Sequence, residues 1–189
     1  RSGVRGERRG RGGNGGSVGV KDPHRLEGDG PLADPPPWLS TEGMGWATRI
    51  LEGHQRAYGV PLLAGTEGRP ARLQAQELFA ATSVVLAHDG GSDPLLAYAN
   101  AAALRLWRRP WAELVGMPSR LTAEPSERPA RAGALAMALR QEAIANYSGI
   151  RIDSRGRRFR IEGARLWSLR NAAGDYCGQA ACFESWWWL

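Results

Sequence analysis

The sequence holds little that could build a covalent or metal-bound framework. Its 189 residues include two cysteines, Cys177 and Cys182, and three histidines, His24, His54 and His88. Two cysteines are too few for a network of disulfides, and none of these residues stands at the spacing of a zinc site. Because the two cysteines are an odd number of positions apart, we expect reduced thiols on opposite faces of one strand. We predict no metal site.

Long apolar runs are missing as well. The longest candidates, residues 83–87 and 134–139, are short beside the roughly 20 residues that cross a bilayer. We therefore expect a soluble intracellular protein with no membrane partner, and the sequence leaves both the cytoplasm and a plastid open as its location.

Lysine is nearly absent. Lys21 is the only one among 25 lysine and arginine residues, a pattern typical of G+C-rich coding. Arginine is then the default cation, so its abundance is weak evidence for a nucleic-acid partner, and we expect none for the folded domain.

Residues for catalysis are also scarce. No serine stands in the strand-to-helix context of a nucleophile elbow, and three histidines offer little from which to build a catalytic triad. We predict that the chain is not an enzyme and has no catalytic residues.

What is present begins with a segment rich in glycine, arginine and proline, residues 1–37. It has no hydrophobic period that could bury a face, so we expect a disordered basic tail. Its Arg11-Gly12-Gly13 triplet leaves open a role in RNA binding through phosphate contacts and base stacking.

After the tail, the hydrophobic pattern changes between helical and strand-like periods. It predicts helices over residues 46–58, 73–79, 101–107, 111–115 and 131–145, and strands over residues 83–87, 95–99, 147–153, 159–169 and 176–183. These elements fit an α+β domain, a five-stranded antiparallel sheet with helices covering one face.

Several segments have amino-acid sequences that match blocks of a known domain family. Residues 93–107, Asp-Pro-Leu-Leu-Ala-Tyr-Ala-Asn-Ala-Ala-Ala-Leu-Arg-Leu-Trp, resemble a block of the MEKHLA domains, which are themselves similar to PAS domains. Further blocks follow in the family's order at residues 111–114, 118–125, 147–151, 156–161 and 178–181. The resemblance covers residues 46–187 and implies a PAS-like fold.

The resemblance also implies a sensing or dimerisation-control role. Such domains occur alone and at the C-terminus of plant homeodomain–leucine zipper regulators. This chain shows neither a homeodomain nor a leucine heptad, so a transcription-factor function does not carry over.

A PAS-like domain can hold a ligand between its sheet and helices, and six residues form the candidate site: His88, Tyr98, Asn100, Trp107, Trp167 and Gln179. Gln179 shares a strand face with Phe183 and could hydrogen-bond a bound ring. The simpler alternatives are a core role for the tryptophans, a turn role for His88, and a backbone partner for Gln179. The cofactor is unknown, and because residues 100–107 lack cysteine, covalent flavin photochemistry is excluded.

Trp186, Trp187 and Trp188 form a candidate interaction surface, because three consecutive aromatic residues on a strand cannot all face one core. Two functions therefore compete. One is a PAS-like sensory module that binds a small apolar or aromatic ligand and signals through its sheet surface or termini. The other is a ligand-free module for dimerisation or docking of a protein partner, with RNA binding by the tail as a third possibility.

Overall fold

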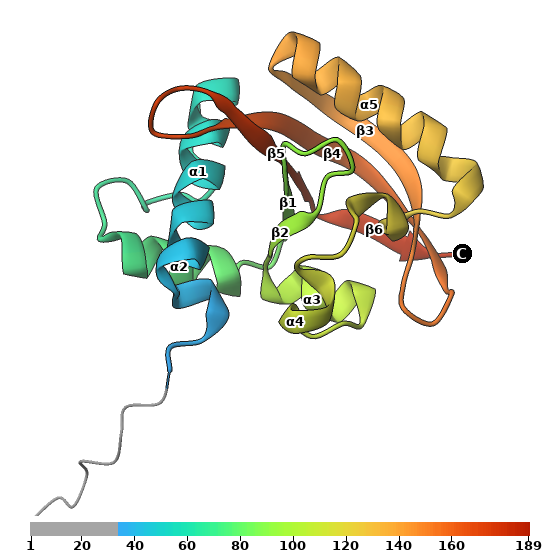
Figure 1. Ribbon diagram of the computed structural model, residues 1–189, viewed down its shortest axis with the longest axis horizontal. Helices are drawn as coiled ribbons and strands as arrows, with labels where there is room; N and C mark the ends of the chain where they lie inside the picture. The colour runs from blue at the N-terminus through green and yellow to red at the C-terminus, as the bar shows by residue number, and fades with distance from the viewer. Residues whose placement is uncertain (1–33) are drawn as a thin grey trace, which may run out of the picture. The chain divides into compact units, whose positions relative to one another are not determined.

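The computed structural model describes residues 34–189 (Figure 1). The folded unit spans Pro35–Leu189 and so begins earlier than the domain expected from residue 46. Trp38 stacks on Phe79 with ring centroids 3.6 Å apart, and Leu39 is buried, which fastens this segment to the core. Most of the predicted tail, residues 1–33 with the Arg11-Gly12-Gly13 triplet, lies outside the described residues.

One antiparallel sheet forms the centre of the domain (Figure 1). Its strands are β1 (Val84–Asp89), β2 (Leu96–Ala99), β3 (Ala143–Ile152), β4 (Arg158–Arg170), β5 (Tyr176–Phe183) and β6 (Ser185–Trp188). The order is β2-β1-β5-β4-β3, with β6 paired to β4. The predicted five-stranded antiparallel sheet is confirmed, and β6 adds a sixth strand to it.

β6 continues the line of β5 along the same edge of the long strand β4. β5 pairs with residues 165–170 of β4, and β6 pairs with residues 159–162. Strand patterning did not predict β6, because three tryptophans in a row show no alternation of polar and apolar residues.

Helices pack on both faces of the sheet, whereas the sequence predicted them on one face (Figure 1). They are α1 (Thr41–Tyr58), α2 (Ala71–Ala80), α3 (Ala101–Trp107), α4 (Trp111–Leu114) and α5 (Arg128–Gln141), with short 3-10 turns η1 (Pro37–Leu39), η2 (Ser119–Thr122) and η3 (Pro125–Glu127). In β1, Val85 and Ala87 pack with α1 and α2, whereas Val84 and Leu86 pack with α3. This alternation divides the interior into an α1 core and an α3 core.

The helix predicted over residues 131–145 ends earlier. α5 stops at Gln141, and Glu142 adopts a left-handed φ of 66°. Ala143 and Ile144 then pair with β4 as the start of β3. The alanine-rich sequence favours a continuing helix, but pairing with β4 overrides that local preference.

The expected opposite placement of the two cysteines is wrong. Both are free thiols, and both pack against the α1 core. The pairing of β4 with β5 shifts register between Leu169 and Arg170, next to Gly178, whose φ is 153°. This irregularity breaks the simple alternation from which opposite faces were inferred.

Candidate ligand-binding site

A cavity of about 50 Å³ lies between the α3 side of the sheet, α3 and α5. Strands β1, β2, β3, β4 and β5 supply its floor, and Leu86, Leu166 and Phe183 make much of that floor apolar. Because a buried water needs roughly 10–15 Å³, the space suits a few waters or one small chemical group. It is far smaller than the roughly 300–1,000 Å³ of pockets that enclose whole ligands.

His88, near the end of β1, lines this cavity and is 5% exposed. Its Nδ1 lies 2.6 Å from the carbonyl oxygen of Asp89, so Nδ1 carries the hydrogen and donates it. Nε2 is buried and has no partner among the described residues. Burial lowers the pKa of the imidazole, so the neutral ring presents a free acceptor at Nε2.

Trp107, at the end of α3, also lines the cavity and is 2% exposed. Its ring meets Phe159 edge-on with centroids 5.2 Å apart, which fixes the indole in the α3 core. Its buried N–H has no partner among the described residues. Trp107 therefore combines the expected core role with an unused hydrogen-bond donor.

Gln179 on β5 lines the cavity together with Phe183, which agrees with the face that the sequence predicted for both. Its Nε2 donates a hydrogen bond of 2.9 Å to the carbonyl oxygen of Leu135 in α5. The Gln179 amide therefore bonds a backbone group, which was the simpler alternative to binding a ligand. This hydrogen bond links α5 to the sheet.

Two arginines at the cavity were not found from the sequence. Arg151 of β3 is 7% exposed, donates to the hydroxyl of Tyr147 at 3.0 Å, and also bonds the neighbouring carbonyl of Ile150. Arg131, in the first turn of α5, has no hydrogen-bond partner among the described residues. Burial, together with the positive charge of Arg151, lowers the pKa of Arg131 to about 10.

Within the described part of the chain, no carboxylate lines the cavity. The strand pattern drew attention to Ile150 and Ile152, whereas the structure buries Arg151 between them and leaves both isoleucines partly exposed. An arginine in an alternating strand could have been noticed, but its burial depends on α5, which packs over this part of β3.

Three of the six predicted site residues do not lie at the cavity. Tyr98 is paired opposite Ala87, and Trp167 opposite Ala180, so both belong to the α1 core on the other face of the sheet. The N–H of Trp167 donates to the carbonyl of Ile50 in α1. Strand register decides which face of the sheet a residue takes, and the sequence did not supply the register of these strands.

Asn100, the third, is fully occupied in holding the backbone. Its Oδ1 accepts from the N–H groups of Val85 and Ala103, and its Nδ2 donates to carbonyls that include that of Ser83 at 2.7 Å. It caps α3, as expected for an asparagine at this position, and ties α3 to β1.

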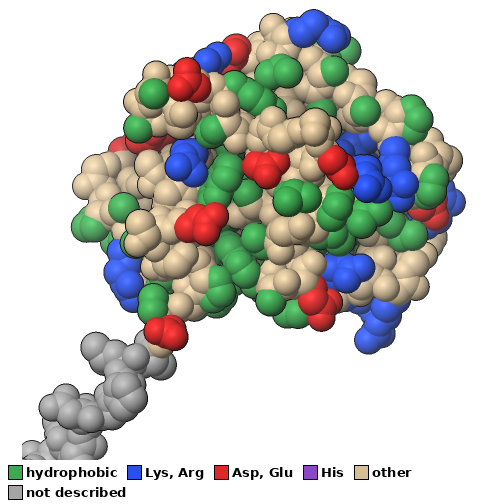
Figure 2. Space-filling model, viewed as in Figure 1, with side chains coloured by type: hydrophobic (Ala, Val, Ile, Leu, Met, Phe, Trp, Pro, Cys, Tyr) green, Lys and Arg blue, Asp and Glu red, His purple; other side chains and the backbone are tan. Residues whose placement is uncertain are grey.

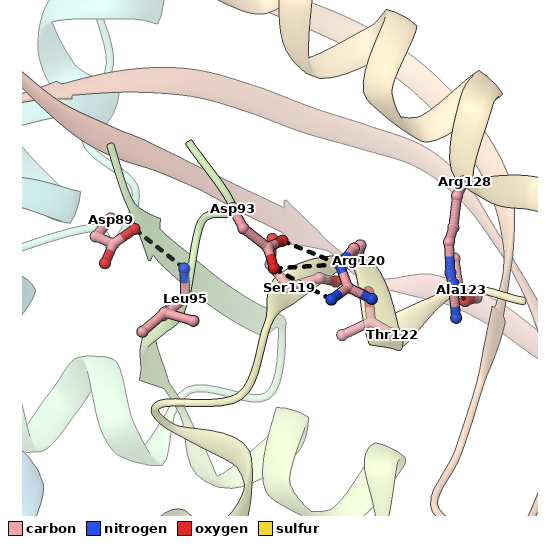
Figure 3. A network of polar contacts seen from close by, with 8 residues as sticks. All are labelled: Asp89, Asp93, Leu95, Ser119, Arg120, Thr122, Ala123 and Arg128. Carbon is pink, nitrogen blue, oxygen red and sulfur yellow. Dashed lines mark hydrogen bonds and ion pairs between the residues drawn. The ribbon is translucent and has the colours of Figure 1, made fainter. Parts of the chain in front are cut away.

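Polar contacts hold the segment that leads into α5 (Figure 3). Arg120 grips the carboxylate of Asp93 at 3.0 and 3.1 Å, the hydroxyl of Thr122 donates to the carbonyl of Ser119, and Arg128 donates to the carbonyl of Ala123. Because Thr122 itself lines the cavity, these contacts position one of its walls.

The three C-terminal tryptophans take two directions from β6. Trp186 and Trp188 contact each other and the ring of Phe159, with Trp188 also beneath Arg157 at 4.1 Å. Trp187 alternates to the other face and is 43% exposed. Trp186 is 37% exposed, so Trp186 and Trp187 both have the outward surface that the sequence predicted for at least one of the three. On the face seen in Figure 2, hydrophobic and charged side chains are interspersed.

Within residues 34–189, no cluster of three or more His, Cys, Asp or Glu side chains could hold a metal ion. In that same part of the chain, no helix is both long and apolar enough to span a membrane.

Comparison with known proteins gives a family. The family model for the MEKHLA domain matches residues 44–188, and no curated protein was found to match. Among solved structures, an RNA-binding Light-Oxygen-Voltage receptor is similar with a TM-score of 0.55 and 23% identity, over 65% of this chain and 35% of that chain. The PAS domain of a protein from Colwellia psychrerythraea is similar with a TM-score of 0.52 and 12% identity. The match covers 59% of this chain and 92% of that chain. The chain thus spans about a third of the receptor's length, and at these identities both structures support the fold alone.

Proposed function

Because the chain belongs to the MEKHLA domain family and has the PAS-like fold, we propose that it is a sensory module that binds a small molecule between α5 and the sheet. The observation that carries this proposal is the cavity itself. It holds a free acceptor on His88 and a free donor on Trp107, both buried. A buried polar atom without a partner costs free energy, so such atoms mark a place where another molecule can supply the partner.

The small apolar or aromatic ligand expected from the sequence has an apolar surface to contact here, made by Leu86, Leu166 and Phe183. A ring does not fit a cavity of about 50 Å³, so its entry would require α5 to move. α5 is suited to this, because Ala138 is its only fully buried residue. Binding of a ligand would then shift the position of α5, because the hydrogen bond from Gln179 to Leu135 joins this helix to the sheet beside the cavity.

Native mass spectrometry of the purified full chain tests the proposal. Ala181 lines the cavity, and Ala181→Val fills part of it, whereas Ala173→Val adds the same atoms at an exposed turn. We expect the wild type and the Ala173 variant to retain a small molecule and the Ala181 variant to lose it. Equal retention of the molecule by both variants would place the ligand outside this cavity. A wild-type protein that carries no bound molecule under gentle ionisation conditions would contradict the proposal.

A second function, ligand-free dimerisation, is favoured by one observation. β6 pairs only with β4 among the described strands, and Trp187 is exposed on it. A free strand edge can pair with a second chain. Dimers of the empty protein that dissociate in Trp187→Ala but persist in Ala181→Val would support this function. RNA binding by the tail concerns residues outside the described part of the chain, and no contact described here bears on it.

A further inference from the structure

The cavity brings two positive charges together, and no carboxylate among the described residues lines it. Arg131 and Arg151 line it from α5 and β3, and the charge of Arg151 adds to burial in lowering the pKa of Arg131. Repulsion between like charges and the loss of water both oppose this arrangement. An anion in the cavity would remove both costs.

Several other arginines of the protein, unlike Arg131 and Arg151, pair with carboxylates. Among the described residues, six such ion pairs occur, and they use Arg69, Arg108, Arg109, Arg120, Arg158 and Arg170. Arg131 and Arg151 are not in this set, although Arg151 is buried and Arg131 is only partly exposed. No described carboxylate serves as their counter-ion, and an anionic ligand would supply one.

We propose that the ligand of this cavity carries a small oxyanion, a carboxylate or a phosphate, which binds between Arg131 and Arg151. Guanidinium groups present several N–H donors in a plane and bind such oxyanions in a forked geometry. The N–H of Trp107 adds a further donor, and a volume of about 50 Å³ suits one such group.

His88 adds a requirement on the rest of the ligand. Its Nε2 is an acceptor, so it repels an oxyanion and favours a hydroxyl or N–H group. The ligand class is thus a small organic acid or phosphate ester with a neighbouring hydrogen-bond donor. An uncharged aromatic ligand would leave both arginines unpaired. This inference rests on the proposed function, since it names the chemistry of the same site.

Thermal unfolding of the full chain tests the inference, with acetate or inorganic phosphate replacing chloride at constant ionic strength. We expect at least one of the two to raise the midpoint by several degrees, with saturation. The two arms distinguish a carboxylate from a phosphate as the preferred group.

Two variants with the same change in charge provide the control. Arg131→Met should abolish the response while leaving the midpoint in chloride equal or higher, because a partly buried charge with no carboxylate partner among the described residues is gone. Arg140→Met, at the exposed end of the same helix, should respond as the wild type does. Arg151→Met serves as a second test if the first variant does not fold.

A wild type that responds equally to acetate, phosphate and chloride would overturn the inference. So would equal responses of the Arg131 and Arg140 variants, which would indicate a general salt effect. If native mass spectrometry finds a molecule that Ala181→Val expels but Arg131→Met retains, the binding function stands and the anionic chemistry is wrong. If neither a bound molecule nor a response to the anions is found, the proposed binding function and the anionic chemistry of its ligand are both wrong.

Discussion

Buried polar side chains in this protein differ in how far their hydrogen bonds are satisfied. Asn100 uses its oxygen and its nitrogen on backbone groups of α2, β1 and α3, which makes it part of the framework. His88 and Trp107 are as deeply buried, yet each keeps one polar atom without a partner. Other buried side-chain atoms, such as the hydroxyl of Tyr98, also lack a partner among the described residues, and what distinguishes His88 and Trp107 is that both line one cavity.

Asn100→Ala tests the framework role. It leaves the N–H groups of Val85 and Ala103 without their acceptor, so unfolding free energy should fall by about 2–4 kcal/mol. Asn171→Ala is the control, because Asn171 makes similar bonds to Ala173 and Asp175 in an exposed turn and should cost about 1 kcal/mol. Urea unfolding measures both. Equal losses of unfolding free energy in the two variants would contradict the framework role of Asn100.

The two described histidines make stability depend on pH. Burial lowers the pKa of His54 and of His88 below 6.5, so the unfolded chain binds protons at a higher pH than the folded one. Stability should therefore decline as pH falls through about 6.5 and recover above it. The thermal midpoint at pH 7.5 and 5.5 measures this. His54→Gln should reduce the difference, and a midpoint that rises on acidification would contradict the burial of both rings.

α5 combines light packing with contact to the cavity, because it buries fully only Ala138 and lines the cavity with Arg131 and Leu135. Met137 and Leu139 point to solvent, and Gln179 supplies its side-chain hydrogen bond to the sheet. Its existence could be predicted from the sequence, but its end could not, because pairing with β4 and not local preference stops it at Gln141. The location of Arg131 over the sheet depends on the same tertiary contacts.

Hydrogen exchange should show this difference between elements. Amides of α5 should exchange well before those of α1, which buries Trp46, Ile50 and His54. Gln179→Leu should speed exchange in α5 further while leaving α1 unchanged, since it removes the bond to Leu135. Mass spectrometry of peptides from the two helices provides the readout. Equal protection of both helices would contradict the view of α5 as a loosely held wall.

At the scale of the whole molecule, the sequence predicted the fold better than the site. The MEKHLA family and the antiparallel sheet follow from ordered blocks and strand periods, which are local properties. Of the six predicted ligand residues, His88, Trp107 and Gln179 meet at the cavity. The others needed the strand register to be placed, and Arg131 and Arg151 needed the packing of α5, neither of which local patterns contain.

A crystal structure of the full chain as purified tests the central claim most directly. The account predicts density for a bound molecule between α5 and the sheet, within hydrogen-bond distance of His88 Nε2 and the Trp107 N–H, with an oxyanion held by Arg131 and Arg151. A cavity that holds only ordered water, bridging these same atoms while α5 stays in place, would contradict it.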